Sequence, residues 1–79
     1  MDNEKARQYF EKLLSIKPND AQALKYVGIS YGMENQHKKA IEYLEKALKF
    51  NPNDAQARQN LEIAKRMMKA EDQGNSRLP

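Results

Sequence analysis

The chain has 79 residues and a net charge of +3, with 32% charged residues, 39% hydrophobic residues, no cysteine and a single histidine. Its length allows one small domain at most, because a comfortable hydrophobic core usually needs about 100 residues. The composition excludes a disulfide framework, a thiol nucleophile and a cysteine- or histidine-rich metal centre, and the charge is less dense than on a typical nucleic-acid-binding surface.

Apolar residues recur at intervals of three and four along four segments, which is the spacing of amphipathic helices. Residues 4–16 show it first, and the segments that start at residues 21, 38 and 55 repeat it. In chain order the positions are Ala6, Phe10, Leu13 and Leu14; Leu24, Val27, Gly28 and Tyr31; Ala40, Ile41, Leu44, Ala47 and Leu48; and Leu61, Ala64 and Met68. No segment alternates with a period of two residues, so the sequence predicts an all-α fold.

Residues with strong turn preferences separate these helices. The Pro-Asn-Asp segments at 18–20 and 52–54 each end one helix with proline and offer an Asp or Asn side chain to cap the next. Residues 34–36 break the second helix from the third, and Asn35 can take the left-handed conformation that ends a helix. Turns this short make neighbouring helices antiparallel. Residues 74–79 are expected to stop the last helix and to form a disordered tail.

A sequence repeat with a period of 34 residues is the strongest signal in the chain. Residues 5–23 and 39–57 are identical at 12 of 19 positions, whereas unrelated segments of this length would share about one. The same offset pairs two isoleucines and two methionines further along, Ile29 with Ile63 and Met33 with Met67. We interpret this pattern as an internal duplication.

A helical hairpin of this period resembles the tetratricopeptide repeat. Residues 21–54 read as one complete repeat, whose signature positions hold Leu24, Val27, Gly28, Tyr31, Ala40, Leu44, Ala47 and Pro52. Residues 1–18 resemble the second helix of a partial repeat, and residues 55–73 resemble a polar closing helix in which the slots of Leu24, Gly28 and Tyr31 hold Arg58, Glu62 and Lys65. The resemblance implies a single domain over residues 1–73, an antiparallel helix-hairpin repeat of about four helices that forms an α-solenoid with a right-handed superhelix.

Small residues at the helix contacts fit this architecture. Gly28 and Ala40 are expected to let the two helices of the hairpin approach closely, and Ala47 is expected to admit the helix that follows. We also attribute Gly32 to helix packing. A phosphate-binding loop is not indicated, because no strand precedes these glycines.

No catalytic, cofactor or metal site is predicted. Glu42 and Glu45 form the kind of carboxylate pair that usually lies in solvent on a helix. His37 opens the third helix, where we expect a structural role at the hairpin turn, because no Asp or Cys stands beside it in the sequence. The serines lack a nucleophile motif. We therefore expect a protein that is not an enzyme and takes no cofactor.

The resemblance implies a peptide-binding surface on the first helices of the repeats, which line the concave side of such arrays. The corresponding residues are Gln22, Lys25, Ile29, Met33, Gln56, Gln59, Asn60, Ile63, Arg66 and Met67. The repeated Ile and Met positions, flanked by amides and two cations, describe a shallow groove for an extended or helical peptide that could carry an acidic group. The alternative, that these residues only pack helix against helix, stays open. We expect a protein–protein interaction or scaffold module with an affinity of about micromolar or weaker.

Other roles stay open at this level. The helix at 4–16 lacks the first helix of its repeat, so Ala6, Phe10 and Leu13 are either partly exposed or covered by another chain, as in a homodimer or a longer array. A structural or designed repeat without a ligand also fits the near-verbatim duplication. RNA binding, known for a related helical repeat, is disfavoured by the small net charge. The lack of cysteine and of long apolar segments predicts a cytoplasmic protein without a membrane partner.

Overall fold

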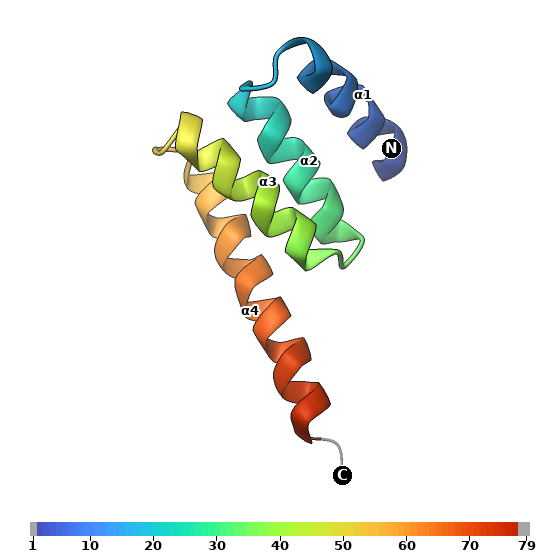
Figure 1. The fold of residues 1–79 in the computed structure, drawn as a ribbon, viewed down its shortest axis with the longest axis vertical. Helices are drawn as coiled ribbons and strands as arrows, with labels where there is room; N and C mark the ends of the chain where they lie inside the picture. Colours follow the sequence, from blue (N-terminus) through green and yellow to red (C-terminus); the bar gives the residue numbers. More distant parts are fainter. Residues whose placement is uncertain (1, 78–79) are drawn as a thin grey trace.

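A computed structural model describes the backbone of residues 2–77 and the side chains of residues 2–71. The described backbone forms four helices and no strand: α1 (Asn3–Ile16), α2 (Ala21–Met33), α3 (His37–Phe50) and α4 (Ala55–Arg77). The helix α4 runs along α3 and then extends well beyond the other helices (Figure 1). The all-α prediction is therefore confirmed, with the first three helices beginning and ending close to the expected residues.

The turns stop and restart the helices as the sequence predicted. The carboxylate of Asp20 accepts a hydrogen bond of 3.0 Å from the backbone N–H of Ala23, and Asp54 accepts one of 3.1 Å from the N–H of Ala57. Both copies of the Pro-Asn-Asp segment therefore cap the helix that follows them in the same way. In the other turn, between α2 and α3, Asn35 has a φ of 62°, which is in the left-handed region expected for it.

The hairpin of α2 and α3 holds a very close helix contact. A Cβ atom at Gly28 would lie 2.8 Å from Cγ of Leu44 and 3.3 Å from the carbonyl oxygen of Ala40. Both Leu44 and Ala40 are 1% exposed, so neither has free space into which it could retreat. The close approach expected at Gly28 and Ala40 is confirmed.

The helix α4 covers another side of α3. Ala47 is buried on α3, as expected for the place where the following helix approaches. One apolar cluster joins the two helices and consists of Ala40, Leu44, Ala57, Leu61 and Ala64. The core of the molecule therefore lies along α3, which has a packed helix on each side.

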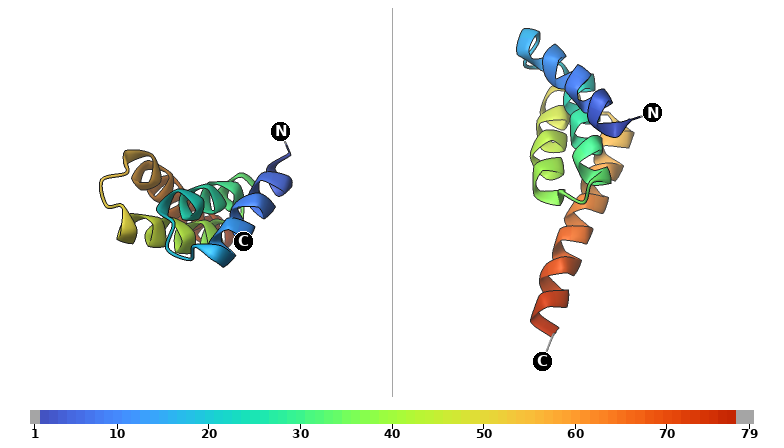
Figure 2. Two further views of the ribbon diagram at one scale, coloured as in Figure 1. Left: turned by 90° about the horizontal axis from the view of Figure 1, so that it is seen from above. Right: turned by 90° about the vertical axis from the view of Figure 1, so that its right-hand side faces the viewer.

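The helix α1 packs on α2 alone and contributes no buried residue. Seen from above, it lies at the side of the molecule away from the turn between α3 and α4 (Figure 2). Ala6, Phe10 and Leu13 are half-buried, which is the first of the two outcomes expected for these residues. The apolar side of α1 is thus only partly covered by this chain.

Polar contacts fix the start of α1 against the end of α2. Nη1 of Arg7 lies 2.6 Å from Oε2 of Glu34. Close to this ion pair, Nδ2 of Asn3 donates a hydrogen bond of 3.1 Å to the backbone carbonyl of Ser30. Because α1 has little apolar burial, these contacts contribute much of the specificity with which it docks.

The helix α4 is longer than the sequence predicted, because it continues past residue 73 to Arg77. A single glycine lowers helix stability by only about 1 kcal/mol, and no proline occurs in this stretch before Pro79. The prediction that residues 74–79 stop the helix was therefore wrong for residues 74–77, and residues 78 and 79 lie outside the described residues. Within the described range, no helix combines the length and the apolar character needed to cross a bilayer.

Candidate functional site

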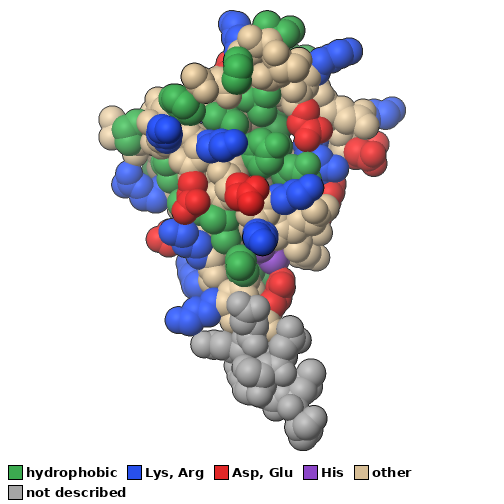
Figure 3. Space-filling view, in the orientation of Figure 1, with side chains coloured by type: hydrophobic (Ala, Val, Ile, Leu, Met, Phe, Trp, Pro, Cys, Tyr) green, Lys and Arg blue, Asp and Glu red, His purple; other side chains and the backbone are tan. Residues whose placement is uncertain are grey.

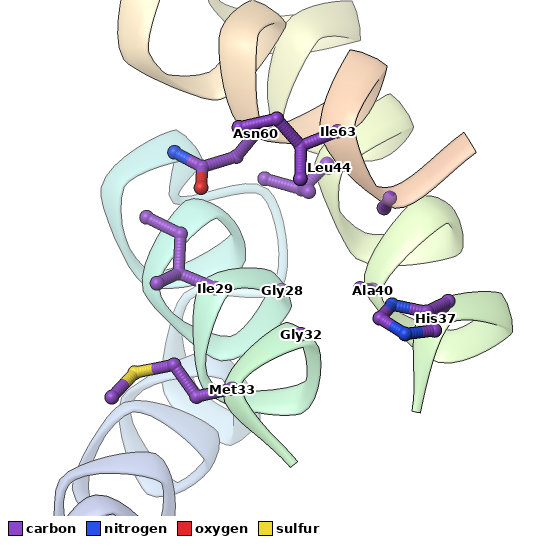
Figure 4. A pocket seen from close by; sticks show the side chains of 10 residues that line it. Gly28, Ile29, Gly32, Met33, His37, Ala40, Leu44, Asn60 and Ile63 are labelled. Carbon is purple, nitrogen blue, oxygen red and sulfur yellow. The ribbon is translucent and has the colours of Figure 1, made fainter. Parts of the chain in front are cut away.

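A groove lies between α2 and α4, with α3 as its floor (Figure 4). It encloses about 200 Å³. Its lining side chains are Ile29 and Met33 from α2, His37, Ala40 and Leu44 from α3, and Asn60, Ile63 and Ala64 from α4, with the backbone of Gly28 and Gly32 between them. The lining is mostly apolar, and its two polar side chains, Asn60 and His37, lie apart (Figure 4).

Four of the ten residues predicted for the inner surface line this groove, namely Ile29, Met33, Asn60 and Ile63. Five others are exposed on the same two helices: Gln22, Gln56, Gln59, Arg66 and Met67. Met33 is 69% exposed and Ile63 is 45% exposed, so apolar surface at the groove is open to a partner. Ile29 also packs against the core cluster, so helix packing explains part of its role.

Lys25 does not lie open on this surface, contrary to the expectation from the sequence. Its side chain is 8% exposed, and its Nζ lies 3.0 Å from Oδ2 of Asp54. Two hydrogen bonds hold the pKa of Asp54 below its ordinary value of 3.8. The larger effect comes from the backbone N–H of Ala57, and the next largest comes from Lys25. The pair joins α2 to the turn before α4, so Lys25 offers no free cation to a ligand.

His37 is a buried polar side chain of the groove. It is the first residue of α3 and is 7% exposed. Its Nε2 lies 3.2 Å from Oε1 of Glu71, but the geometry does not form a hydrogen bond, and neither ring nitrogen has a hydrogen-bond partner among the described residues. The sequence placed His37 at the hairpin turn but missed its place in the groove. Helical spacing could have shown it, because residues 37, 40 and 44 share one helix face.

The two glycines of α2 differ in what they do. The prediction that helix packing explains both is confirmed for Gly28 and is wrong for Gly32. A Cβ atom at Gly32 would have Ala40 Cβ as its nearest neighbour, at 3.8 Å, which is an ordinary van der Waals distance. The backbone at Gly32 has no positive φ either, so an alanine would fit there.

A cluster of aromatic and charged side chains joins α1 to α2. The guanidinium carbon of Arg7 lies 4.5 Å from the ring centroid of Tyr31, and the Tyr31 hydroxyl donates a hydrogen bond of 3.3 Å to Glu11. Burial raises the pKa of Tyr31, and the negative charge of Glu11 raises it further by a smaller amount. A tyrosine with a raised pKa stays neutral near neutral pH, so this cluster holds α1 in place rather than supplying a nucleophile.

The charged side chains on the rest of the described surface are dispersed. Glu42 and Glu45 are exposed on α3. Positive and negative side chains are interspersed with apolar ones over the face shown in Figure 3, without a large region of one sign. Among the described residues, no group of three or more His, Cys, Asp or Glu is placed to hold a metal ion.

Models of one known protein family match two adjoining parts of the chain. Two family models, both described as Tetratricopeptide repeat, match residues 21–54 and residues 2–20. The first match spans α2, α3, the turn between them and the turn after α3. The second match spans α1 and the turn that follows it. No curated protein matches the chain. The order of the matches is a half repeat followed by a full repeat, as the sequence predicted.

Proposed function

Because the chain belongs to the tetratricopeptide repeat family, whose repeats generally mediate contacts between proteins, we propose that it binds a peptide segment of a partner protein in the groove between α2 and α4. The observation that carries the proposal is the groove itself, which is apolar, open to solvent and lined by three helices. Repeats of this family are typically non-enzymatic, and the proposed role requires binding alone.

The groove is held in shape by the packing of the helices around it. The contact of Gly28 with Leu44 fixes α2 against α3, and the cluster around Leu61 fixes α4 against α3. A preformed surface loses little conformational entropy when it binds. Because one repeat and its neighbouring helices offer a small contact area, we expect an affinity of about micromolar or weaker.

Exposed side chains on the two helices that form the groove walls extend the proposed binding surface. They are Gln22 on α2 and Gln56, Gln59, Arg66 and Met67 on α4. Their amides can exchange hydrogen bonds with the backbone of an extended peptide, and Arg66 can pair with an acidic group. Lys25 is left out of this surface because Asp54 already neutralises it.

A selection experiment tests the proposal. A displayed library of random peptides is selected on the full chain, and each ligand is measured against two variants. Ile63→Glu puts a charge on the groove wall at a residue that is 45% exposed, so the variant should fold and should bind ligands about tenfold more weakly or worse. Ile16→Glu makes the same change on α1 at a residue that is 74% exposed, and it should leave binding unchanged. Ligands that tolerate Ile63→Glu would contradict the proposal.

A second candidate function is self-association through α1. Tyr9 is 65% exposed and meets Phe10 edge-on with ring centroids 5.1 Å apart, while Phe10 stacks on Tyr26 at 5.0 Å. With the half-buried Ala6 and Leu13, these rings form an apolar face that a second copy could cover. A dimer that Tyr9→Glu dissociates, measured as molar mass over about a hundredfold range of concentration, would support this role. A monomer over the whole range would exclude it.

A further inference from the structure

The groove contains a glycine that the fold does not require. A side chain at Gly28 would force its surroundings to shift, because a Cβ atom would lie 2.8 Å from Leu44, whereas a Cβ atom at Gly32 would have no neighbour closer than 3.8 Å. A glycine inside a helix is less favourable than an alanine at the same position. Gly32 therefore leaves open space in the groove that packing does not demand.

A buried histidine of the same groove forms no hydrogen bond with any described residue, although the Glu71 carboxylate lies 3.2 Å from its Nε2. His37 is 7% exposed, and neither of its ring nitrogens has a hydrogen bond within the described part of the chain. A buried polar atom without a partner is unfavourable, and a ligand that supplies the partner recovers this loss on binding. The histidine therefore favours a ligand with a polar atom at the position that reaches the ring.

The size and lining of the groove limit what can enter it. Its volume of about 200 Å³ is below the range of about 300–1,000 Å³ that is usual for small-molecule pockets, so it suits one large side chain. Met33 and Ile63 lie on opposite walls (Figure 4). A thioether makes favourable contacts with an aromatic ring, and an aliphatic wall packs against its face.

We propose that the groove receives one tyrosine side chain of the partner peptide, with its ring over Gly32 between Met33 and Ile63 and its hydroxyl at His37. This inference rests on the proposed function and specifies the ligand of the same groove. A neutral imidazole has one donor and one acceptor nitrogen, and a phenol hydroxyl both donates and accepts. The hydroxyl can therefore pair with either tautomer, and it brings no charge into the apolar lining.

Other side chains satisfy fewer of these features. An aliphatic side chain or phenylalanine fills the groove but leaves His37 without a hydrogen bond. A carboxylate would carry a negative charge into an apolar space beside Glu71, whose Oε1 lies 3.2 Å from the ring nitrogen. Tyrosine is the residue whose apolar body and neutral polar tip match both the walls and the histidine.

Two small probes test the role of His37 directly. N-acetyl-tyrosine amide and N-acetyl-phenylalanine amide are titrated into the full chain, and the amide chemical shifts of Gly32 and His37 are followed by NMR. The tyrosine probe should bind about tenfold more tightly, which is the size of effect expected for one added hydrogen bond to a buried group. In His37→Phe, which keeps an aromatic ring, this preference should disappear. Equal binding of the two probes, or a preference that survives in His37→Phe, would overturn the inference.

Filling the space above Gly32 provides a second test. In Gly32→Leu the new side chain should occupy the groove and weaken the tyrosine probe about tenfold or more, because the ring and the leucine compete for the same volume. Gln8→Ala, a change at an exposed residue of α1, should leave binding unchanged. Circular dichroism checks that both variants fold. Full binding by a folded Gly32→Leu variant would overturn the inference.

The library selection separates failure of this inference from failure of the proposed function. Peptides that bind the full chain, lose affinity in Ile63→Glu and share a tyrosine would support both. Peptides that depend on Ile63 but share a residue other than tyrosine would overturn this inference and leave the proposed function standing. The absence of any peptide that depends on Ile63 would overturn both.

Discussion

The helices α1 and α3 have closely similar sequences and very different surroundings. Six of their residues are repeated at an offset of 34: Lys5, Ala6, Tyr9, Glu11, Lys12 and Leu14 recur as Lys39, Ala40, Tyr43, Glu45, Lys46 and Leu48. Yet α3 buries four residues between α2 and α4, whereas α1 packs on α2 alone and buries none. The repeat sequence thus specifies a helix with two apolar contact faces, and the neighbours decide how much of each face is buried.

Substitution at one repeat position should sharpen this comparison most. Leu44→Ala removes a fully buried side chain and should lower the free energy of unfolding by about 2–5 kcal/mol. Phe10→Ala, at the equivalent position of α1, should cost less although it removes a larger side chain, because Phe10 is only partly buried. Urea unfolding followed by circular dichroism measures both losses. An equal or larger loss for Phe10→Ala would show that α1 depends on its apolar contacts as strongly as α3 does, and the contrast between the two helices would fail.

The two glycines of α2 should respond in opposite directions. Gly28→Ala forces a Cβ atom against Leu44 and should cost about 1–3 kcal/mol of unfolding free energy. Gly32→Ala makes only an ordinary contact with Ala40, and it should raise stability by up to about 1 kcal/mol through better helix propensity. Melting temperatures of the two variants give the comparison. If Gly32→Ala instead lowers the melting temperature, helix packing does require a glycine at this position.

The two Pro-Asn-Asp turns differ in one interaction that acid should reveal. Asp20→Ala removes a helix cap and should cost about 1 kcal/mol, while Asp54→Ala should cost more because it also leaves Lys25 buried without its partner. The folded pKa of Asp54 lies below its ordinary value of 3.8. Its contribution is therefore complete above that value and disappears as the pH falls through the lower folded pKa.

Unfolding free energies measured at several pH values below about 5 test this assignment. The wild-type chain should lose more stability on acidification than Asp54→Asn, which cannot ionise at that position. The matched Asp20→Asn variant serves as the control for the cap alone. Identical acid profiles for wild type and Asp54→Asn would mean that the ion pair with Lys25 adds nothing to stability.

Much of the fold follows from local features of the sequence. Proline, aspartate and asparagine at the turns mark helix ends because each acts on its own few residues, and the structure has Asp20, Asp54 and Asn35 in those roles. The close approach at Gly28 was also predictable, since the resemblance to the tetratricopeptide repeat implied that Gly28 and Ala40 let the two helices of the hairpin come together. The end of α4 was not, because a glycine weakens a helix without stopping it.

The site was less predictable because it depends on residues far apart in the chain. Ile29, Met33, Asn60 and Ile63 could be assigned to one surface through the resemblance to the tetratricopeptide repeat, and the repeat offset pairs Ile29 with Ile63. The burial of Lys25, however, depends on Asp54, 29 residues later, and spacing along one helix does not reveal such a pair. The helix face that His37 shares with Ala40 and Leu44 was visible in the spacing, but the groove that this face lines with Gly32 exists only when α2, α3 and α4 are placed together.

A chemical-shift map of the full chain tests the central claim most directly. A peptide selected on the chain is titrated into it, and the backbone amides that shift are located. We predict that the shifts concentrate at the residues that line the groove between α2 and α4, namely Ile29, Gly32, Met33, His37, Asn60, Ile63 and Ala64. Shifts concentrated instead on α1 around Ala6, Phe10 and Leu13 would contradict this prediction and would make the uncovered face of α1 the binding surface.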